Sequence, residues 1–301
     1  MAPTITPLLS APSLTLGRFR CPPDVPNWDR STTIGPLAHV VFPERPVSIT
    51  RASTGPQIGD RNWALLYAPD EEYMRELVDP QGDECTFVAL SPELLDDLVS
   101  STPSAPQTFG VGRVLVGTPT WLAYQHCLSA AERVTDAGQV LDPLDLESRL
   151  LTVLSNVLQD PAVNEPTRAL RGDARSRRAS DRRVHEACRL LATRLDERLT
   201  ISAVASAVGL SAYHFCRVFR ATTGLTVHAY RERLRLRQAF ATCATTPSRK
   251  LAEIAISTGY ASHSHMTTSF RASLQMSPSA VRDRYARGVA EAGRLEPFSF
   301  R

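Results

Sequence analysis

The sequence predicts an α+β protein: a β-rich N-terminal domain followed by an all-α domain with two helix-turn-helix units joined by a long helix. Short β-branched and aromatic runs alternate with turn signals up to about residue 117. A two-helix pattern is written twice beyond residue 199, and a long amphipathic segment separates the two copies. We therefore expect domains at residues 1–159 and 182–288, a flexible basic linker at 160–181, and a tail at 289–301.

Five short runs in the first domain have the composition of strands. Val, Ile, Thr and aromatic residues favour strands, whereas the Pro, Gly and Asp residues between the runs favour turns. Several short strands separated by turns are typical of a small barrel or jelly roll. The expected strands are His39–Phe42, Val47–Ala52, Asn62–Ala68, Glu84–Leu90 and Val111–Gly117.

Three helices are expected after these strands, beginning at Ser91-Pro92, Thr118-Pro119 and Asp142-Pro143. Each pair places a capping side chain before a proline, which suits the first helical turn. The third helix should end near Leu158, and it has one apolar stripe, formed by Leu146, Leu150, Val153, Leu154 and Val157. The pattern fits packing on the chain's own β-domain and pairing with a second copy equally well.

Residues 160–181 lack apolar periodicity and contain Pro, Gly, Ser and clustered Arg. This composition is typical of a linker.

The first two-helix unit begins at Thr200, a capping residue, and its first helix ends at Gly209. Ser211 is placed to cap the second helix. One stripe of that second helix is apolar, formed by Phe215, Val218 and Phe219, and the opposite face carries Tyr213, Cys216, Arg217 and Arg220. Two short helices that meet at a glycine are typical of a helix-turn-helix.

The same pattern returns about fifty residues later. Ile254 corresponds to Val204, Gly259 to Gly209 and, after one inserted residue, Ser262 to Ser211. Between the copies, Val227 to Cys243 should form one helix capped by Thr226. We expect Tyr230, Leu234 and Ala239 to be buried, and a polar face of Arg231, Arg233, Arg235 and Arg237.

This segment resembles the DNA-binding domain of the AraC/XylS family of bacterial transcription regulators. The resemblance runs from about Val184 to Arg284 and rests on Gly209-Leu210-Ser211, Phe219-Arg220, Gly224, Arg233-Leu234-Arg235-Leu236 with Ala239, Ala252-Glu253-Ile254-Ala255, Gly259-Tyr260, Ser264-His265, Phe270-Arg271 and Ser277-Pro278. Two positions depart from the family pattern, because Val227 stands where proline is usual and Gln275 where glycine is usual.

The resemblance implies a sequence-specific transcription regulator, typically an activator, that binds double-stranded promoter DNA and acts with RNA polymerase. It also implies a cupin-like N-terminal domain that senses an unknown small-molecule effector or dimerises. Because members of the family dimerise through that domain, the resemblance favours a homodimer.

The candidate DNA-binding residues are carried over from the family pattern. The second helix of such a unit enters the major groove, where its N-terminal half meets base edges. The base-facing candidates are Tyr213, Cys216 and Arg217 in the first unit and His263, Ser264, Thr267 and Thr268 in the second. Arg220 and Arg271 lie later in their helices, so we expect them at phosphates. We expect His265 to be structural and no metal at His263 and His265, because an i, i+2 pair does not share a helix face.

Charge is distributed unevenly along the chain. The net charge is only +3, but residues 171–301 carry 23 Arg and Lys against 10 Asp and Glu, and the first 170 residues carry 11 against 21. A polycationic C-terminal part suits a DNA duplex, which presents one phosphate charge per ~1.7 Å of its axis.

Several other classes of protein are disfavoured. The sequence has no G-x-S-x-G, Walker A, H-E-x-x-H or strand-associated G-x-G-x-x-G motif, so we expect no enzyme. Only His39 and His126 precede residue 170, which argues against a histidine metal cluster, and we expect no cofactor. Neither a signal peptide nor an apolar run of about 18 residues is present, so we expect a cytoplasmic protein that does not enter the membrane.

The six cysteines form no C-x-x-C pair, which disfavours a disulfide framework and a zinc finger. An alternative function uses the same DNA-binding domain with Cys21 and Cys85 as a redox or electrophile sensor. The competing interpretation is that both are small buried apolar residues, since neither has a thiolate-stabilising neighbour in the sequence.

Overall fold

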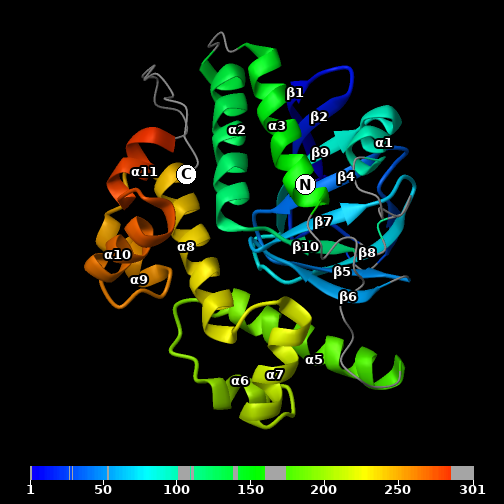
Figure 1. The fold of residues 1–301 in the computed structure, drawn as a ribbon. Helices are drawn as coiled ribbons and strands as arrows, with labels where there is room; N and C mark the ends of the chain where they lie inside the picture. The colour runs from blue at the N-terminus through cyan, green and yellow to red at the C-terminus, as the bar shows by residue number, and fades with distance from the viewer. Residues whose placement is uncertain are drawn as a thin grey trace.

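The computed structural model describes residues 2–26, 28, 30–52, 54–100, 109, 112–137, 142–159 and 174–285. Its N-terminal part is built from two antiparallel sheets and three helices, and its C-terminal part is helical (Figure 1). The predicted α+β organisation is confirmed. The predicted tail at 289–301 lies outside the described residues.

The larger sheet has the strand order β1-β2-β9-β4-β7-β10, and the smaller sheet has the order β3-β8-β5-β6. The two sheets face each other, and side chains from β4, β7 and β9 meet side chains from β5 between them. The strands are β1 (Thr4–Ser10), β2 (Leu14–Cys21), β3 (Ser31–Thr33), β4 (Ala38–Pro43), β5 (Val47–Arg51), β6 (Gly55–Gly59), β7 (Trp63–Tyr67), β8 (Glu72–Leu77), β9 (Asp83–Leu90) and β10 (Arg113–Leu115).

The five predicted runs form β4, β5, β7, β9 and β10. The sequence pattern does not predict β1, β2, β3, β6 or β8. Strands β1, β3 and β6 lie at sheet edges and bury few apolar side chains, so their sequences lack the apolar enrichment of a central strand.

The helices α1 (Pro92–Ser100), α2 (Thr118–Ala137) and α3 (Pro143–Leu158) begin where the Pro-containing pairs predicted. Helices α2 and α3 pack on the face of the larger sheet that points away from the smaller one. All five stripe residues of α3 are buried in this chain, with exposed fractions of 0–3%. The stripe therefore packs on its own domain, and it is not a free surface for a second copy.

The C-terminal part consists of α5 (Ala174–Thr193), α6 (Ile201–Ala207), α7 (Ala212–Thr223), α8 (Val227–Thr245), α9 (Leu251–Ser257), α10 (His263–Leu274) and α11 (Pro278–Tyr285). The linker prediction is wrong for residues 174–181, which begin α5; residues 160–173 lie outside the description. The apolar stripe of α5 starts only at Val184, because the described residues before it are exposed or half-buried.

Helix α8 is held against the N-terminal part by a buried polar network. The Tyr230 hydroxyl donates to Asp60 Oδ2 at 2.5 Å and accepts from Trp63 Nε1 at 2.8 Å. Asn62 Nδ2 donates to the Tyr230 carbonyl at 3.1 Å. The first turn of α8 is thus fixed to the chain just before β7.

Arg237 forms the second attachment of α8. Its Nη1 and Nη2 donate to the carbonyls of Arg61 and Val116 at 2.5 and 2.6 Å, and its guanidinium lies 5.0 Å from the ring centroid of Trp121. The prediction that Arg237 belongs to a polar face is therefore wrong, since its exposed fraction is 0%. Burial lowers the pKa of Arg237 to about 9, so the side chain is still cationic at neutral pH.

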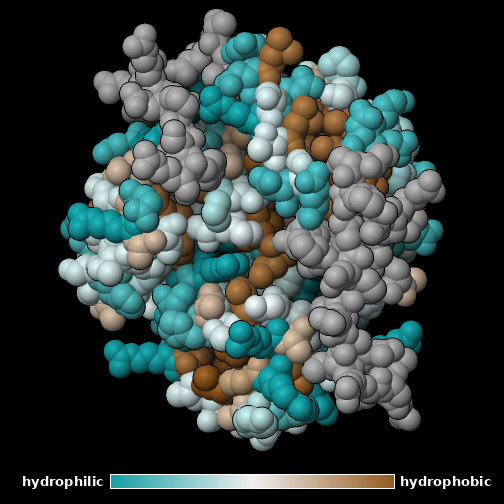
Figure 2. Space-filling model, in the orientation of Figure 1, coloured by the Kyte–Doolittle hydropathy of each residue, from teal (hydrophilic) through white to brown (hydrophobic). Residues whose placement is uncertain are grey.

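On the face that Figure 2 shows, the described residues are mostly hydrophilic or mixed, and hydrophobic residues gather in separate places. One of these places lies over the α6 and α7 region at the bottom of the view, where Ile201 is 45% exposed. Within the described residues, no single helix has the length and apolarity needed to cross a membrane. Helices α6 and α7 meet that criterion only when counted together, and they are bent by 82° at their junction.

Candidate nucleic-acid interface

Two helix pairs of similar design lie near opposite ends of α8 (Figure 1). In the first pair, Thr200 Oγ1 accepts from the Ala203 N–H at 3.1 Å and Ser211 Oγ accepts from the His214 N–H at 3.3 Å. These two hydrogen bonds begin α6 and α7 where the sequence predicted. Between the helices, Gly209 adopts a φ of +67°, a left-handed conformation that glycine takes without strain.

The second pair repeats this geometry with local changes. Ser262 Oγ accepts from the His265 N–H at 3.1 Å and begins α10, and Gly259 has a φ of +86°. Lys250 precedes α9 without a side-chain cap. The glycine position is also more crowded here, because a Cβ on Gly259 would lie 2.0 Å from the Leu195 carbonyl oxygen.

Each pair packs around an apolar core that also includes residues of the N-terminal part. The first core joins α5, α6, α7 and the start of α8 to Ile58 and Trp63, and it includes Phe215 and Phe219. The second joins α9, α10, α11 and the end of α8 to α2, α3 and the larger sheet, and it includes Met266 and Phe270. Because α8 contributes to both cores, it fixes the second helices of the two pairs, α7 and α10, relative to each other.

The residues predicted to meet DNA lie outside these cores. On α7, Tyr213, Arg217 and Arg220 are exposed and Cys216 is half-buried. On α10, Thr267 is half-buried, and the others, namely His263, Ser264, Thr268 and Arg271, are exposed. The structure therefore gathers each set on one accessible helix face, and Tyr213 is 82% exposed.

The two faces differ in chemistry. Arg217 lies 3.3 Å from His214 through Nη2 and Nδ1, and it presents a long cationic side chain. Thr267 and Thr268 donate their hydroxyl hydrogens to the carbonyls of His263 and Ser264, at 2.9 and 3.1 Å. The side chains on the face of α10 are thus shorter and less basic than those on the face of α7.

His265 packs against Tyr260, with ring centroids 5.3 Å apart and planes nearly perpendicular. This contact agrees with a structural role for His265. Among the described residues, no group of three or more His, Cys, Asp or Glu side chains has the arrangement of a metal site.

Two arginines of α8 have intramolecular partners that sequence analysis missed. Arg231 donates to the Glu197 carbonyl, and Arg235 donates through Nε and Nη2 to the Leu195 carbonyl at 3.2 Å. Both carbonyls follow the C-terminal end of α5, where backbone acceptors have no helical partner. These arginines therefore stabilise the path between α5 and α6.

The attachment of α8 was also missed, although a signal for it exists. Tyr230, Leu234, Arg237 and Ala241 follow the i, i+4, i+7, i+11 spacing of a single helix face. All four are buried. Helical spacing alone therefore places Arg237 on the buried side.

Residues 204–284 match a protein-family model described as a helix-turn-helix domain. The C-terminal region therefore contains a helix-turn-helix domain. The match begins within α6 and extends through α7, α8, α9 and α10, and it confirms the resemblance noted in the sequence over these residues.

Three solved structures are similar to this chain. An AraC-type DNA-binding domain regulator from Chromobacterium violaceum is 25% identical, with 37% of this chain and 99% of that chain covered and a TM-score of 0.34. The DNA-binding domain of AdpA, in complex with a target DNA, is 27% identical, with 34% and 91% covered and a TM-score of 0.32. ToxT from Vibrio cholerae is 10% identical over 93% of this chain and 100% of its own, with a TM-score of 0.34.

Proposed function

We propose that the protein is a sequence-specific transcription regulator that inserts α7 and α10 into the major groove of promoter DNA. The observation that carries this proposal is that both helices of an AraC-type domain present polar or basic faces away from their cores. Tyr213, Cys216, Arg217, His263, Ser264, Thr267 and Thr268 are the base-facing residues of the proposal. Arg220 and Arg271 are its phosphate contacts.

Regulation by the N-terminal part is the second element of the proposal. Asp60, Asn62, Trp63 and Arg61 contact α8, the helix that fixes α7 relative to α10. A change in the β-sheets that moves the start of β7 therefore acts on the position of α8 and of the recognition helices that it carries. The partners in this proposal are promoter DNA, RNA polymerase and a small-molecule effector. A homodimer remains part of it through a surface other than the buried stripe of α3.

The cysteine-sensor alternative has less support. Cys21 and Cys85 are buried free thiols, and burial raises the pKa of both, that of Cys85 well above its ordinary value. A thiol that is protonated and inaccessible reacts slowly with oxidants and electrophiles. The chemistry of these positions is that of small buried apolar side chains.

DNA binding by the full chain at several salt concentrations tests the proposal. The full chain is preferable to an isolated C-terminal fragment, because Tyr230 and Arg237 would lose their buried partners in the fragment. Affinity should fall linearly with the logarithm of salt concentration. The double variant Arg220→Ala with Arg271→Ala should reduce that slope by about 0.9 for each phosphate that the protein no longer neutralises.

Arg149→Ala is the matched control for this experiment. Arg149 is an exposed arginine on α3 that pairs with Asp145 on the same helix. This variant should leave the slope unchanged. A full chain that is folded and shows no salt-dependent binding to any duplex would contradict the proposal.

A further inference from the structure

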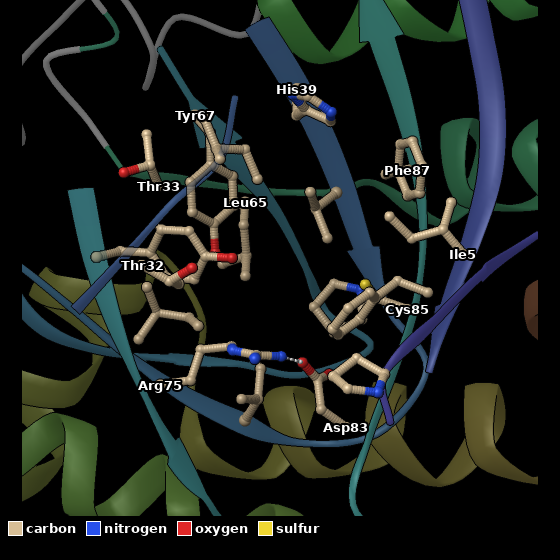
Figure 3. Close-up of a pocket in the computed structure, with 18 residues that line it drawn as sticks. Ile5, Thr32, Thr33, His39, Leu65, Tyr67, Arg75, Asp83, Cys85 and Phe87 are labelled. Atoms are coloured by element: carbon tan, nitrogen blue, oxygen red, sulfur yellow. Dashed lines mark hydrogen bonds and ion pairs between the residues drawn. The ribbon is translucent and has the colours of Figure 1, made fainter. Parts of the chain in front are cut away.

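A cavity of about 320 Å³ lies between the two sheets of the N-terminal part (Figure 3). It is lined by residues of β1, β2, β4, β7 and β9 from the larger sheet and of β3, β5 and β8 from the smaller one. For comparison, an apolar cavity of ~150 Å³ holds one benzene molecule. The cavity therefore has room for a molecule of about two rings.

Most of the cavity wall is apolar or aromatic. Ile49 and Leu65 contribute aliphatic surface, and Phe19, Tyr67 and Phe87 contribute rings. Such walls favour a ligand whose surface is largely apolar, because its transfer from water into the cavity is favourable.

One end of the cavity is polar and holds a buried carboxylate. Arg75 and Asp83 meet there, with Arg75 Nη1 3.4 Å from Asp83 Oδ2 (Figure 3). The Asp83 side chain is only 6% exposed, and its Oδ1 accepts no hydrogen bond from the described part of the chain. Burial raises the pKa of Asp83 to about 6 against the opposing effect of Arg75, so the carboxylate predominates at neutral pH. A buried carboxylate oxygen without a donor is unfavourable unless a ligand supplies one.

The negative charge of the Asp83 carboxylate is already balanced by Arg75. His39 lies toward the opposite end, and its Nδ1 is 2.9 Å from the Leu37 carbonyl (Figure 3). Burial lowers the pKa of His39, which favours its neutral form. A ligand with a net charge would leave that charge uncompensated in an apolar cavity, at a high free-energy cost.

We propose that this cavity binds an uncharged, largely apolar ring compound whose hydroxyl or N–H group donates to Asp83 Oδ1. The phenol oxygens of Tyr67 and Tyr73 make no hydrogen bond within the described residues, and they are available to a second polar group of the ligand. This proposal rests on the proposed regulatory role of the N-terminal part and assigns the chemical class of its effector.

The cavity is connected to the recognition helices by one strand. Residues 63, 65 and 67 of β7 alternate onto the same side of the strand. Leu65 and Tyr67 line the cavity, and Trp63 donates to Tyr230 of α8. A ligand that displaces β7 therefore also displaces Trp63, and with it the hydrogen bond that holds α8.

Calorimetric titration of the full chain with four naphthalene derivatives tests the ligand class. 2-Naphthol carries a neutral donor, 2-methoxynaphthalene has nearly the same shape without a donor, 2-naphthoate is an anion, and 2-naphthylmethylamine is a cation. We expect 2-naphthol to bind roughly tenfold or more tightly than each of the other three, which is the usual effect of one hydrogen bond to a charged group.

Three variants assign the binding to this cavity. Asp83→Asn should reduce 2-naphthol affinity and abolish its advantage over 2-methoxynaphthalene, whereas Asp97→Asn, at an exposed position on α1, should change neither. Val41→Phe, which places a larger side chain at a lining position on β4, should weaken the binding of all four compounds. Far-ultraviolet circular dichroism and thermal unfolding identify any variant that does not fold. If Asp83→Asn fails to fold, Val41→Phe still tests the place of binding, and the selectivity of the wild type among the four compounds still tests the ligand class.

Absence of binding by any compound at millimolar concentration would overturn the proposal. So would equal binding of 2-naphthol and 2-methoxynaphthalene, or preference for 2-naphthoate or the amine. DNA binding by the same protein samples is measured in a separate titration. Ligand binding that survives in a chain without DNA binding would contradict the proposed function alone, and DNA binding without ligand selectivity would contradict the effector class alone.

Discussion

The hydroxyl of Tyr230 lies 2.5 Å from Asp60 Oδ2 and 2.8 Å from the indole nitrogen of Trp63. One phenol thus satisfies a buried acceptor and a buried donor that precede it by about 170 residues in the chain. All three side chains are at least 95% buried, so water does not replace these hydrogen bonds. The first turn of the helix that spaces the two recognition helices is therefore fixed to the β-domain by buried hydrogen bonds, and Arg237 provides a second attachment farther along the same helix.

Tyr230→Phe tests this attachment. Removing the hydroxyl leaves Asp60 Oδ2 and Trp63 Nε1 without their partner, and we expect the free energy of unfolding to fall by about 1 to 3 kcal/mol. Tyr213→Phe removes a hydroxyl from a tyrosine that is 82% exposed, and it should leave stability unchanged. Urea unfolding of both variants measures the difference, and equal stabilities would contradict a stabilising role for the network.

Asp60 should also make stability depend on pH. Burial raises the pKa of Asp60 from 3.8 to about 6, although the Tyr230 hydroxyl acts in the opposite direction. Between pH 4 and 6 the folded state then binds more protons than the unfolded state at this site, so the Asp60 contribution to stability falls as the pH rises. The effect corresponds to about 1.4 kcal/mol for each unit of pKa shift.

Asp60→Asn isolates this contribution. Burial lowers the pKa of His126 and His185 to about 4, and their contribution to stability therefore rises over the same pH range. Burial also raises the pKa of Asp83 to about 6, so two carboxyl groups oppose the two histidines and the wild type should show a weak overall dependence. The stability of Asp60→Asn relative to the wild type should increase from pH 4 to 6 and stay constant above about pH 7. A constant difference throughout would show that the Asp60 pKa is not raised.

Gly259 and Gly209 occupy equivalent turns but should respond differently to alanine. A Cβ at Gly259 would lie 2.0 Å from the Leu195 carbonyl oxygen and 2.7 Å from Arg235 Nε, whereas a Cβ at Gly209 meets nothing within 4 Å. We expect Gly259→Ala to destabilise by about 3 kcal/mol or more, because the backbone after α5 must move. Gly209→Ala should cost about 1 kcal/mol, from its positive φ alone. Thermal unfolding of the two variants distinguishes them.

Gln275 ends α10 with a φ of +56°, and Gly224 ends α7 with a φ of +75°. A left-handed conformation is unfavourable for a side chain such as that of glutamine. Gln275→Gly should therefore raise the free energy of unfolding by up to about 1 kcal/mol, and Gly224→Gln should lower it by a similar amount. If both substitutions destabilise, the Gln275 side chain has a stabilising contact that offsets its backbone strain.

The helical region was predictable because its signals are local. Thr200, Ser211, Thr226 and Ser262 cap the helices they were predicted to cap, and the apolar spacing identified the buried residues of α7. The prediction for Arg237 is wrong because arginine is usually exposed, whereas position 237 lies on the buried face of α8. Its charge is stabilised by the carbonyls of Arg61 and Val116, which no local pattern reveals.

The β-domain was less predictable because its organisation depends on distant pairing. β2 lies between β1 and β9, and its Gly17 accommodates the Phe87 ring, with a Cβ there only 2.5 Å from Phe87 Cζ. The polar end of the cavity arises where β8 and β9 bring Arg75 and Asp83 together across the two sheets. Neither relation is visible from the spacing of residues along one strand.

The recognition helices should contribute unequally to sequence discrimination. Arg217 is exposed on α7 and long enough for a bidentate contact with guanine O6 and N7, a contact that discriminates by about 1 to 3 kcal/mol. Thr268 occupies the corresponding position on α10, and its hydroxyl hydrogen is donated to the Ser264 carbonyl at 3.1 Å. Threonine is also too short to span a base edge, so we expect α10 to discriminate less between bases than α7 does, and Arg271 to position α10 through a phosphate contact.

Selection of binding sites from random duplexes by the wild type, Arg217→Ala and Thr268→Ala checks this asymmetry. Arg217→Ala should relax base preference in one half of the site, while Thr268→Ala should change affinity and preference little. Arg149→Ala controls for the loss of a positive charge elsewhere, and circular dichroism confirms that each variant is folded. The two half-sites should lie about 34 Å apart, one helical turn, because α8 fixes the separation of α7 and α10. A motif that depends on Thr268 and is indifferent to Arg217 would reverse the assignment and make α10 the principal reader.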